Sequence, residues 1–409
     1  MTGPTTTAPR PFRMAPLAIA ALTGTMAMMA YVAVIGPVVR RLGLPEWVAG
    51  LSITVGGVFW MLLARWWGGV SDRHGRKPVL LAGLAAFALV YGALAIGVDL
   101  ALRGHLAPLA VIALLIVTRA LIGAFYAAVP PTAAATIVDH TPPQLRASRM
   151  AQLGTANALG MVAGPAAAGW LATRDLGIAL YAAATLPVLA LLVIGLALPH
   201  RAPSHAVADA GKRPGAALRL RDPRLRQACA TAFLAMTSVA IAQVLVGFFA
   251  IDRLGLSEQA GARVAGLSLA AVGVSLIVSQ QFVMRCKSVP PTRWIWTGAL
   301  IGGLGFSSVL FAHSQAALLS SYGFAAFGMG LIFPTFQAMA ANAVQPHEQG
   351  AAAGVLSAAQ GLGMVLGPLA GTLLYRLAPA LPYLVVGGAL IALSVYTASR
   401  TQPRSALKH

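Results

Sequence analysis

The feature that most constrains this chain is a succession of long apolar runs separated by short polar segments. A helix needs about 20 mainly apolar residues to cross the hydrocarbon core of a bilayer, and every run reaches that length. The runs are continuous and do not alternate between apolar and polar residues, which excludes a β-barrel. They predict an all-α membrane protein with 12 transmembrane helices, near residues 14–38, 46–66, 78–98, 107–130, 150–172, 177–198, 228–250, 263–284, 294–313, 316–340, 350–374 and 379–399.

The composition agrees with a chain that lies in lipid. Hydrophobic residues make up 58% of the 409 residues and charged residues only 10%, whereas a soluble chain has about 25% charged residues. Arg10 and Arg13 precede a first run that is too long for the apolar part of a cleavable signal peptide. We therefore expect the first run to remain in place as a spanning helix.

The net charge of +19 is distributed in a way that indicates topology. If the N-terminus lies inside, the cytoplasmic segments hold 21 Lys and Arg residues, the outer segments hold seven, and Arg119 lies within a helix. Cytoplasmic loops of membrane proteins carry such an excess of positive charge. We expect a multi-pass protein of the cell inner (cytoplasmic) membrane with both termini in the cytoplasm. Its basic charge then faces anionic lipid and not nucleic acid.

The two halves of the chain repeat each other. The segment RLGLPEWVAGLS at 41–52 resembles RLGLSEQAGARVAGLS at 253–268, and a shift of 203 residues brings GMVAGP at 160–165 onto GMVLGP at 363–368. Parallel repeats of six helices are a transporter architecture, in which two bundles move around a central site. We predict an N-terminal six-helix bundle over residues 1–198, a cytoplasmic linker over 199–227 and a C-terminal six-helix bundle over 228–409, related by pseudo-symmetry.

A compact polar segment, GGVSDRHGRKPVLL at 68–81, lies between the second and third runs. Gly68 and Gly69 allow close approach of another helix, and Gly75 permits a tight turn. Asp72 can face a helix N-terminus or a guanidinium group. The segment resembles the signature loop of the major facilitator superfamily, which also lies between helices 2 and 3. The matching residues are Gly68, Asp72, Arg73, Gly75, Arg76 and Lys77.

The resemblance implies a latch that holds the cytoplasmic side of the protein in one conformation. In this family the aspartate is understood to meet the N-terminal end of helix 11. The arginines are understood to meet an acid at the end of helix 4, where Asp139 stands in this chain. Arg146, a few residues further on, completes the expected gating and coupling set.

Two further motifs extend the resemblance to the drug:proton antiporter branch of the family. RALIG at 119–123 resembles the helix 4 motif with a buried arginine, although Ile122 stands where glutamine is usual. GMVAGPAAAG at 160–169 resembles the helix 5 motif typical of exporters, with small glycine faces and a proline bend. Helix packing is the expected role of Gly160, Gly164, Pro165, Gly169, Gly363, Gly367 and Pro368.

Arg119 is the one charged residue that we expect deep inside the membrane, where a charge is costly and marks a functional site. All ten acids fall in loops or near helix ends, so a cavity around Arg119 should favour anionic or neutral substrates. Helices 1, 4, 7 and 10 line the cavity in the family. The candidate substrate contacts on them are Met28, Tyr31, Tyr126, Gln243, Phe248, Phe333, Phe336 and Gln337.

These observations predict a monomeric secondary active exporter of a small anionic or neutral amphiphilic molecule that works by alternating access. The resemblance implies proton coupling, with Asp72, Asp139, Glu46 and Asp252 as possible carriers. The substrate could be an endogenous metabolite such as a carboxylate siderophore. A multidrug efflux pump for neutral or cationic drugs is the alternative, and an uptake facilitator is less favoured.

We do not expect an enzyme, a metal site or a cofactor. No nucleophile–base pair or metal-ligand cluster falls at membrane depth, and the two cysteines, Cys229 and Cys286, form no disulfide framework. The chain contains no GxxxxGK[ST] loop, so ATP is not the direct driver.

Overall fold

The computed structural model describes residues 13–198, 222–286, 288–345 and 348–401, and these residues contain helices but no strand. The N-terminal bundle holds α1 (Ala15–Arg41), α2 (Trp47–His74), α3 (Arg76–Leu102), α4 (Pro108–Tyr126), α5 (Val129–His140), α6 (Pro143–Ala172) and α7 (Leu176–Ala197). The C-terminal bundle holds α8 (Arg226–Leu254), α9 (Glu258–Arg285), α10 (Pro291–Ser308) with the short helix η2 (Val309–Phe311), α11 (Gln315–Asn342), α12 (Gln349–Leu377) and α13 (Leu381–Thr401).

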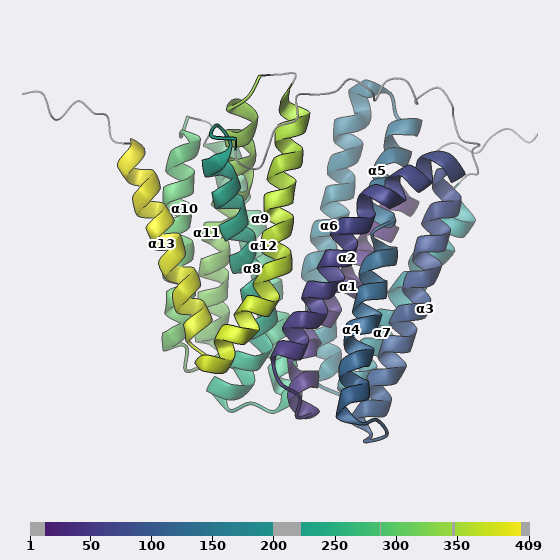
Figure 1. Ribbon diagram of the computed structural model, residues 1–409. Coiled ribbons are helices and arrows are strands. Elements are labelled where there is room, and N and C mark those ends of the chain that lie inside the picture. Colours follow the sequence, from purple (N-terminus) through teal and green to yellow (C-terminus); the bar gives the residue numbers. More distant parts are fainter. Residues whose placement is uncertain (1–12, 199–221, 287, 346–347, 402–409) are drawn as a thin grey trace, which may run out of the picture.

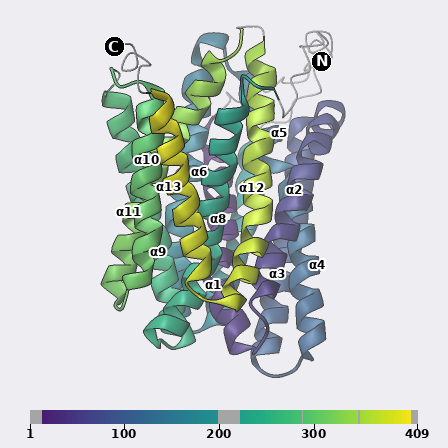
Figure 2. The same ribbon diagram turned by 60° about the vertical axis from the view of Figure 1, so that its left-hand side comes forward.

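Twelve spans result when α4 is joined with α5 and α10 with η2. Eleven described spans are long and apolar enough to cross a membrane. The twelfth is α6, a helix of 30 residues whose first turns are rich in polar side chains and whose remainder packs between α1 and α9. Figures 1 and 2 show the two bundles standing side by side with all helices roughly aligned. The predicted all-α membrane fold with two six-helix bundles is confirmed.

The two bundles repeat each other in detail. Gly43 after α1 and Gly255 after α8 both have φ 64°, a conformation that favours glycine. A Cβ on Gly83 would lie 3.1 Å from the carbonyl oxygen of Phe125, and one on Gly298 would lie 2.7 Å from that of Gly328. Position 328 is position 125 shifted by 203 residues. The same helix contact is therefore built twice, which gives the pseudo-symmetry a structural basis.

The bundles meet at one end, which we call the closed end; it is the end at which α2 follows α1 and α9 follows α8. There Thr54 of α2 donates a hydrogen bond of 2.7 Å to the carbonyl oxygen of Val365 in α12. A Cβ on Gly36 of α1 would lie 3.4 Å from Phe248 of α8. Gly169 of α6 packs in the same way against the backbone of α9. Small residues at these crossings let the backbones approach closely.

At the other end, which we call the linker end, α7 ends and α8 begins and the two bundles diverge (Figure 1). A Cβ added to Gly68, Gly69, Gly154 or Gly354 would meet no atom within 4 Å. The close helix approach expected at Gly68 and Gly69 is therefore wrong for this conformation. The physical reason is that α2 and α12 separate towards this end, although they touch at Thr54.

The polar segment 68–81 is helical and not an extended loop. Helix α2 continues to His74, α3 begins at Arg76, and Gly75 between them has φ 91°. The predicted tight turn thus falls on a glycine, which has no side chain to clash at a positive φ. The charged residues of the segment consequently lie in the last turn of α2 and the first turn of α3, which Gly75 alone connects.

The glycines of the helix 5 motif pack as the sequence predicted. A Cβ on Gly160 would lie 2.6 Å from the carbonyl oxygen of Leu22 in α1, and one on Gly363 would lie 2.6 Å from that of Phe233 in α8. Gly164 and Gly367 follow one turn later and face the same two helices, while Pro165 and Pro368 lie inside α6 and α12. Because the contact occurs in both bundles, it is a general element of bundle packing.

We predict opposite effects for two alanine substitutions on α6. Gly160→Ala should lower the free energy of unfolding by about 1–3 kcal/mol, because its new methyl group meets backbone that cannot move aside. Gly154→Ala should raise it by about 0.5–1 kcal/mol, because alanine loses less backbone entropy in an open helical position. Melting temperatures of the purified proteins in detergent check both signs. A stabilised Gly160→Ala protein would contradict the packing described above.

Candidate functional site

Arg119 of α4 is the centre of a buried cluster in the N-terminal bundle. Its side chain is 2% exposed, and its guanidinium carbon lies 4.4 Å from the centre of the Tyr31 ring. The Nη1 atom lies 3.7 Å from the sulfur of Met28. The structure therefore brings together three residues that the sequence proposed separately. A cation over an aromatic face contributes about 2 kcal/mol or more where water is excluded.

The aromatic side of this cluster is fixed by hydrogen bonds. Ser52 donates its one hydroxyl hydrogen to the carbonyl oxygen of Ala49, so Tyr31 is the donor in the 2.8 Å bond that joins its hydroxyl to Ser52. Tyr91 of α3 donates to the carbonyl oxygen of Ala27 at 2.7 Å. The sequence reasoning missed Ser52 and Tyr91, because nothing local distinguishes them from ordinary helix residues.

Close helix packing leaves little room around the guanidinium. A Cβ on Gly56 of α2 would lie 3.0 Å from the backbone oxygen of Arg119 and 3.5 Å from its Nη2 atom. Gly123, one turn after Arg119, faces the backbone of Gly56. The glycine four residues after the arginine, noted in the sequence, thus permits the approach of α2 to α4.

No carboxylate neutralises Arg119 among the described residues. Its Nε atom is buried without a hydrogen-bond partner, and the described acids lie at helix ends, as predicted from the sequence. They are Glu46, Asp72, Asp99, Asp139, Asp175, Asp222, Asp252, Glu258 and Glu348. A buried charge without a counter-ion is costly and is retained where it serves a function.

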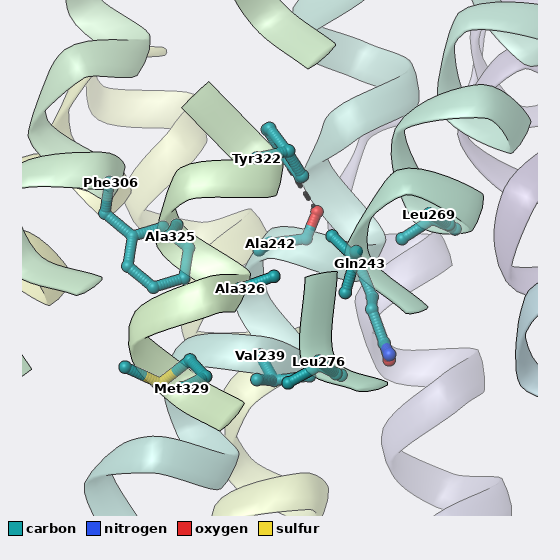
Figure 3. Close-up of a pocket in the computed structure, with 11 residues that line it drawn as sticks. Val239, Ala242, Gln243, Leu269, Leu276, Phe306, Tyr322, Ala325, Ala326 and Met329 are labelled. Carbon is teal, nitrogen blue, oxygen red and sulfur yellow. Dashed lines mark hydrogen bonds between the residues drawn. The ribbon is translucent and has the colours of Figure 1, made fainter. Parts of the chain in front are cut away.

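A pocket lies in the C-terminal bundle between α8, α9, α10 and α11 (Figure 3). Gln243 lines it, as does Tyr322, whose hydroxyl donates to the carbonyl oxygen of Ala242 at 3.0 Å and contacts the Tyr383 hydroxyl at 2.7 Å. The other lining side chains are apolar: Val239, Ala242, Leu269, Val272, Leu276, Phe306, Ala325, Ala326 and Met329. The sequence had singled out only Gln243 among them.

The remaining candidate substrate contacts lie elsewhere. Phe248 is fully buried at the closed end, where its ring lies 5.6 Å from the Arg40 guanidinium carbon. Phe333 and Phe336 pair with each other at 6.1 Å between ring centres, outside the residues that line the pocket. Gln337 is exposed near the end of α11. These four residues are not in the Arg119 cluster. The sequence could not show this, because helix periodicity alone does not distinguish a side chain that faces a cavity from one that faces a neighbouring helix.

Tyr126 takes part in helix packing beside the Arg119 cluster. Its ring centre lies 5.0 Å from that of Phe87, and its hydroxyl lies 3.5 Å from Thr25. Gly24 accommodates the ring, since a Cβ there would lie 2.7 Å from it. Thr25 also donates to Asn157 of α6 at 2.8 Å.

Charged residues connect the bundles at the closed end. Arg40 of α1 forms ion pairs with Glu46 at 2.8 Å and with Asp252 of α8. Tyr375 of α12 donates a 2.9 Å hydrogen bond to the same Asp252 carboxylate, and Arg41 lies 3.9 Å from Glu258 of α9. This network joins the two bundles where they touch. This ion pair could have been predicted from the sequence. Arg40 and Asp252 stand directly before the two copies of RLGL, at equivalent positions of the repeats, and carry opposite charges.

At the linker end, Arg76 connects α2, α3 and α5. It donates to Asp72 at 2.5 Å and to Asp139 at 2.8 Å, so the expected contact between this arginine and the acid after helix 4 is present. Lys77 donates to the last carbonyl groups of α7, at Gly195 and Leu198, where a cation suits the helix dipole. Arg73 is exposed, and the Arg146 side chain lies outside the described residues.

Among the described residues, the contact expected between Asp72 and the start of α12 is not made in this conformation. The Asp72 side chain is 65% exposed and pairs with Arg76 of the next helix. Glu348 stands before the first turn of α12 and binds Arg224 at 2.8 Å. Hydrogen bonds from Arg224 to Glu348 and Asp222 raise the pKa of that guanidinium. The charged contacts of the closed end are therefore formed in this conformation, whereas Asp72 pairs only within its own bundle among the described residues.

Comparison with known proteins agrees with this geometry. The family model of the Major Facilitator Superfamily matches residues 17–368 and 286–408. The chain is 32% identical over 354 residues to the class G tetracycline resistance protein of Vibrio anguillarum, covering 84% of this chain and 85% of that protein. It is 30% identical over 334 residues to the class C tetracycline resistance protein of Escherichia coli, covering 80% and 79%. The chain belongs to the major facilitator superfamily and is a multi-pass membrane transporter.

Solved structures share the fold at low sequence identity. The nucleoside transporter NupG superimposes with a TM-score of 0.69 at 14% identity, over 96% of this chain and 99% of that one. A bacterial homologue of the human lysosomal transporter Spinster, in an inward-facing and occupied conformation, gives 0.69 at 15% identity over 95% and 91%. At these identities the likeness concerns the arrangement of helices.

The stacking of Arg119 on Tyr31 can be measured by two substitutions. Tyr31→Phe keeps the ring and loses the hydrogen bond to Ser52, which should cost about 1 kcal/mol of unfolding free energy. Tyr31→Leu also removes the aromatic face from the buried guanidinium and should cost at least about 2 kcal/mol more. Melting temperatures in detergent give the order. If the leucine variant is as stable as the phenylalanine variant, the stacking makes no net contribution.

Proposed function

We propose that this protein is a proton-coupled exporter that moves a small anionic or neutral amphiphile outward by alternating access, with Arg119 at the substrate site. The unpaired, buried guanidinium is the observation that supports a negative substrate group. In a cavity of low dielectric constant, an anion next to Arg119 would gain far more Coulomb energy than it does in water.

Outward transport is supported by the relatives and by the helix 5 motif. A transporter that confers resistance does so most simply by removing the compound from the cell, and four relatives above 25% identity carry tetracycline resistance in their names. We place the linker end in the cytoplasm because the basic residues gather there. In this orientation both termini are cytoplasmic, and the protein acts as a monomer in the inner membrane.

The conformational cycle follows from the two sets of charges. With the Arg40–Asp252 network formed and the Asp72 latch open, the protein would take substrate from the cytoplasm. Closing the linker end would bring Asp72 to the start of α12 and would break the contacts at the closed end. Protons would then bind at acids that change partners during this motion, and Asp72, Asp139, Glu46 and Asp252 are the available groups.

Transport into inverted membrane vesicles tests the proposed substrate charge. The compounds are matched carboxylates, neutral amides and lipophilic amines. We expect the carboxylates to accumulate, and Arg119→Gln to reduce their accumulation at least tenfold because one full charge interaction is lost. Arg285→Gln removes an exposed arginine at the linker end and is the control, with accumulation unchanged. Equal carboxylate transport by the Arg119→Gln protein would overturn the site assignment.

An imposed pH gradient tests the coupling in the same vesicles. An acidic vesicle lumen should accelerate carboxylate accumulation severalfold, and collapse of the gradient by a protonophore should remove that increase. Accumulation that responds only to membrane potential would contradict proton exchange, since an anion can also leave along the electrical gradient.

A multidrug or tetracycline-type efflux pump is the second candidate, favoured by the names of the relatives. The same panel separates the two functions. Strong preference for a neutral polycyclic drug or for lipophilic amines, with no effect of Arg119→Gln, would support the drug pump. Preference for carboxylates would support export of an organic acid, of which a carboxylate siderophore is one example.

A further inference from the structure

The charged network of the closed end divides unevenly between the two bundles. Arg40 of α1 and Glu46, directly before α2, both belong to the N-terminal bundle and form an ion pair at 2.8 Å. Asp252 of α8 and Tyr375 of α12 both belong to the C-terminal bundle, where the tyrosine donates its 2.9 Å hydrogen bond to the carboxylate. The ion pair of Arg40 with Asp252 crosses the seam. Separation of the bundles would therefore leave Glu46 with its arginine and Asp252 without one.

The acids of the linker end behave differently, because they keep their cation when the bundles move as rigid bodies. Arg76 holds both Asp72 and Asp139, and all three residues belong to the N-terminal bundle. The other described ion pairs within hydrogen-bond distance also join residues of one bundle: Asp99 with Arg103, and Asp222 and Glu348 with Arg224. Among the residues that the structure describes, Asp252 is thus the acid whose hydrogen-bonded arginine belongs to the opposite bundle.

A second pair crosses the seam but is weaker. Arg41 and Glu258 lie 3.9 Å apart, which is too long for a hydrogen bond, and exposed pairs of this kind contribute little. The titratable and charged groups on the helix ends around Asp252 are Arg40 and Arg41 of α1, Glu46 before α2, Arg253 of α8, Glu258 of α9, Tyr375 and Arg376 of α12 and Tyr383 of α13.

The carboxylate of Asp252 is within reach of protons from the aqueous phase at the closed end. Its side chain is 27% exposed, and this end faces the outer solution in the orientation that we propose. Loss of a neighbouring cation favours the protonated form of a carboxylic acid, and a neutral carboxyl group no longer attracts a guanidinium. Protons would therefore bind more tightly to the separated bundles than to the joined ones. By reciprocity, acid in the outer solution would favour separation.

We propose that Asp252 is the gating acid of this transporter, whose protonation opens the exit to the outer solution. The proton comes from the outer solution when Arg40 leaves, and it returns there when Arg40 comes back. Asp252 therefore controls the exit and does not carry the proton across the membrane. The open form leaves no unpaired guanidinium, because Arg40 retains Glu46. This inference rests on the proposed function for the orientation and the direction of transport, and it assigns different roles to the candidate acids.

A distance measured across the closed end tests the proposal. His105 lies before α4 and His313 before α11, both are exposed, and they belong to different bundles. Nitroxide labels on His105→Cys and His313→Cys report the width of this end by electron paramagnetic resonance in liposomes. The labelled full-length protein also carries Cys229→Ala and Cys286→Ser, so that no other thiol reacts. The two labelling sites remove two histidines that would titrate in the tested range.

We expect the population with the wide distance to be about threefold larger at about pH 5 than at about pH 8, as for the loss of one partly exposed ion pair. Asp252→Asn should give the larger population at both pH values, because asparagine is neutral. Glu46→Gln is the matched control, since it removes a carboxylate from the same arginine but leaves the pair that crosses the seam. Glu46→Gln and the linker-end variant Asp139→Asn should both retain the pH response.

A second variant guards against a purely structural effect of the asparagine. Arg40→Gln breaks the crossing pair from the other bundle while Asp252 is intact, and it should also enlarge the wide population and abolish its pH response. If Asp252→Asn retains the full pH response, the proposal is overturned. Loss of the response in Glu46→Gln but not in Asp252→Asn would assign the gating role to Glu46 instead.

The outcomes also separate this inference from the proposed function. If an imposed pH gradient does not accelerate accumulation in vesicles, but the distance still responds to pH through Asp252, proton exchange fails and the gating role stands. If the gradient accelerates accumulation and the distance in the Asp252→Asn protein still responds to pH, the gating role fails and proton exchange stands.

Discussion

The N-terminal bundle is packed around one guanidinium that is buried without a carboxylate among the described residues. Arg119 lies on the ring of Tyr31, which is held in turn by Ser52, and the surrounding helices can come this close because Gly56 and Gly123 have no side chains. Stacking and dipoles offset part of the cost of desolvating the charge, but they do not neutralise it. The N-terminal bundle therefore presents a fixed positive charge at membrane depth. If this charge contacts the substrate, as we propose, the charge of the substrate would affect its binding more strongly than its shape.

The two repeats share their helix packing and differ in the side chains at the positions of Arg119 and Tyr322. Glycine contacts such as Gly160 with Thr25 and Gly363 with Thr237 are conserved between the repeats of this chain, because helix spacing requires them in both bundles. The positions of Arg119 and Tyr322, which spacing does not constrain, became a cation and an aromatic residue. A transporter built from two copies can in this way offer a substrate different side chains in its two bundles without changing how the helices of either bundle pack.

Much of the fold could be predicted from the sequence, because apolar runs of spanning length and a repeated RLGL segment leave few other arrangements. The burial of Arg119 could also be predicted, since a lone arginine in an apolar run is conspicuous. The apolar pocket was not accessible, because its alanines and leucines look the same as residues that face lipid. Phe248 illustrates the limit: the same periodicity that suggested a cavity contact serves a contact between bundles at the closed end. Only the tertiary arrangement decides between the two.

The Arg40–Asp252 pair lies at matching positions of the two repeats, next to the seam where the bundles meet. A homodimer of either half alone would place two arginines or two aspartates face to face at that seam, and like charges in such a place repel. The opposite charges therefore make each half a poor partner for itself and a good partner for the other. An ancestral dimer of identical subunits had no means to form this contact, so the pair records a step that required the two copies to differ in sequence.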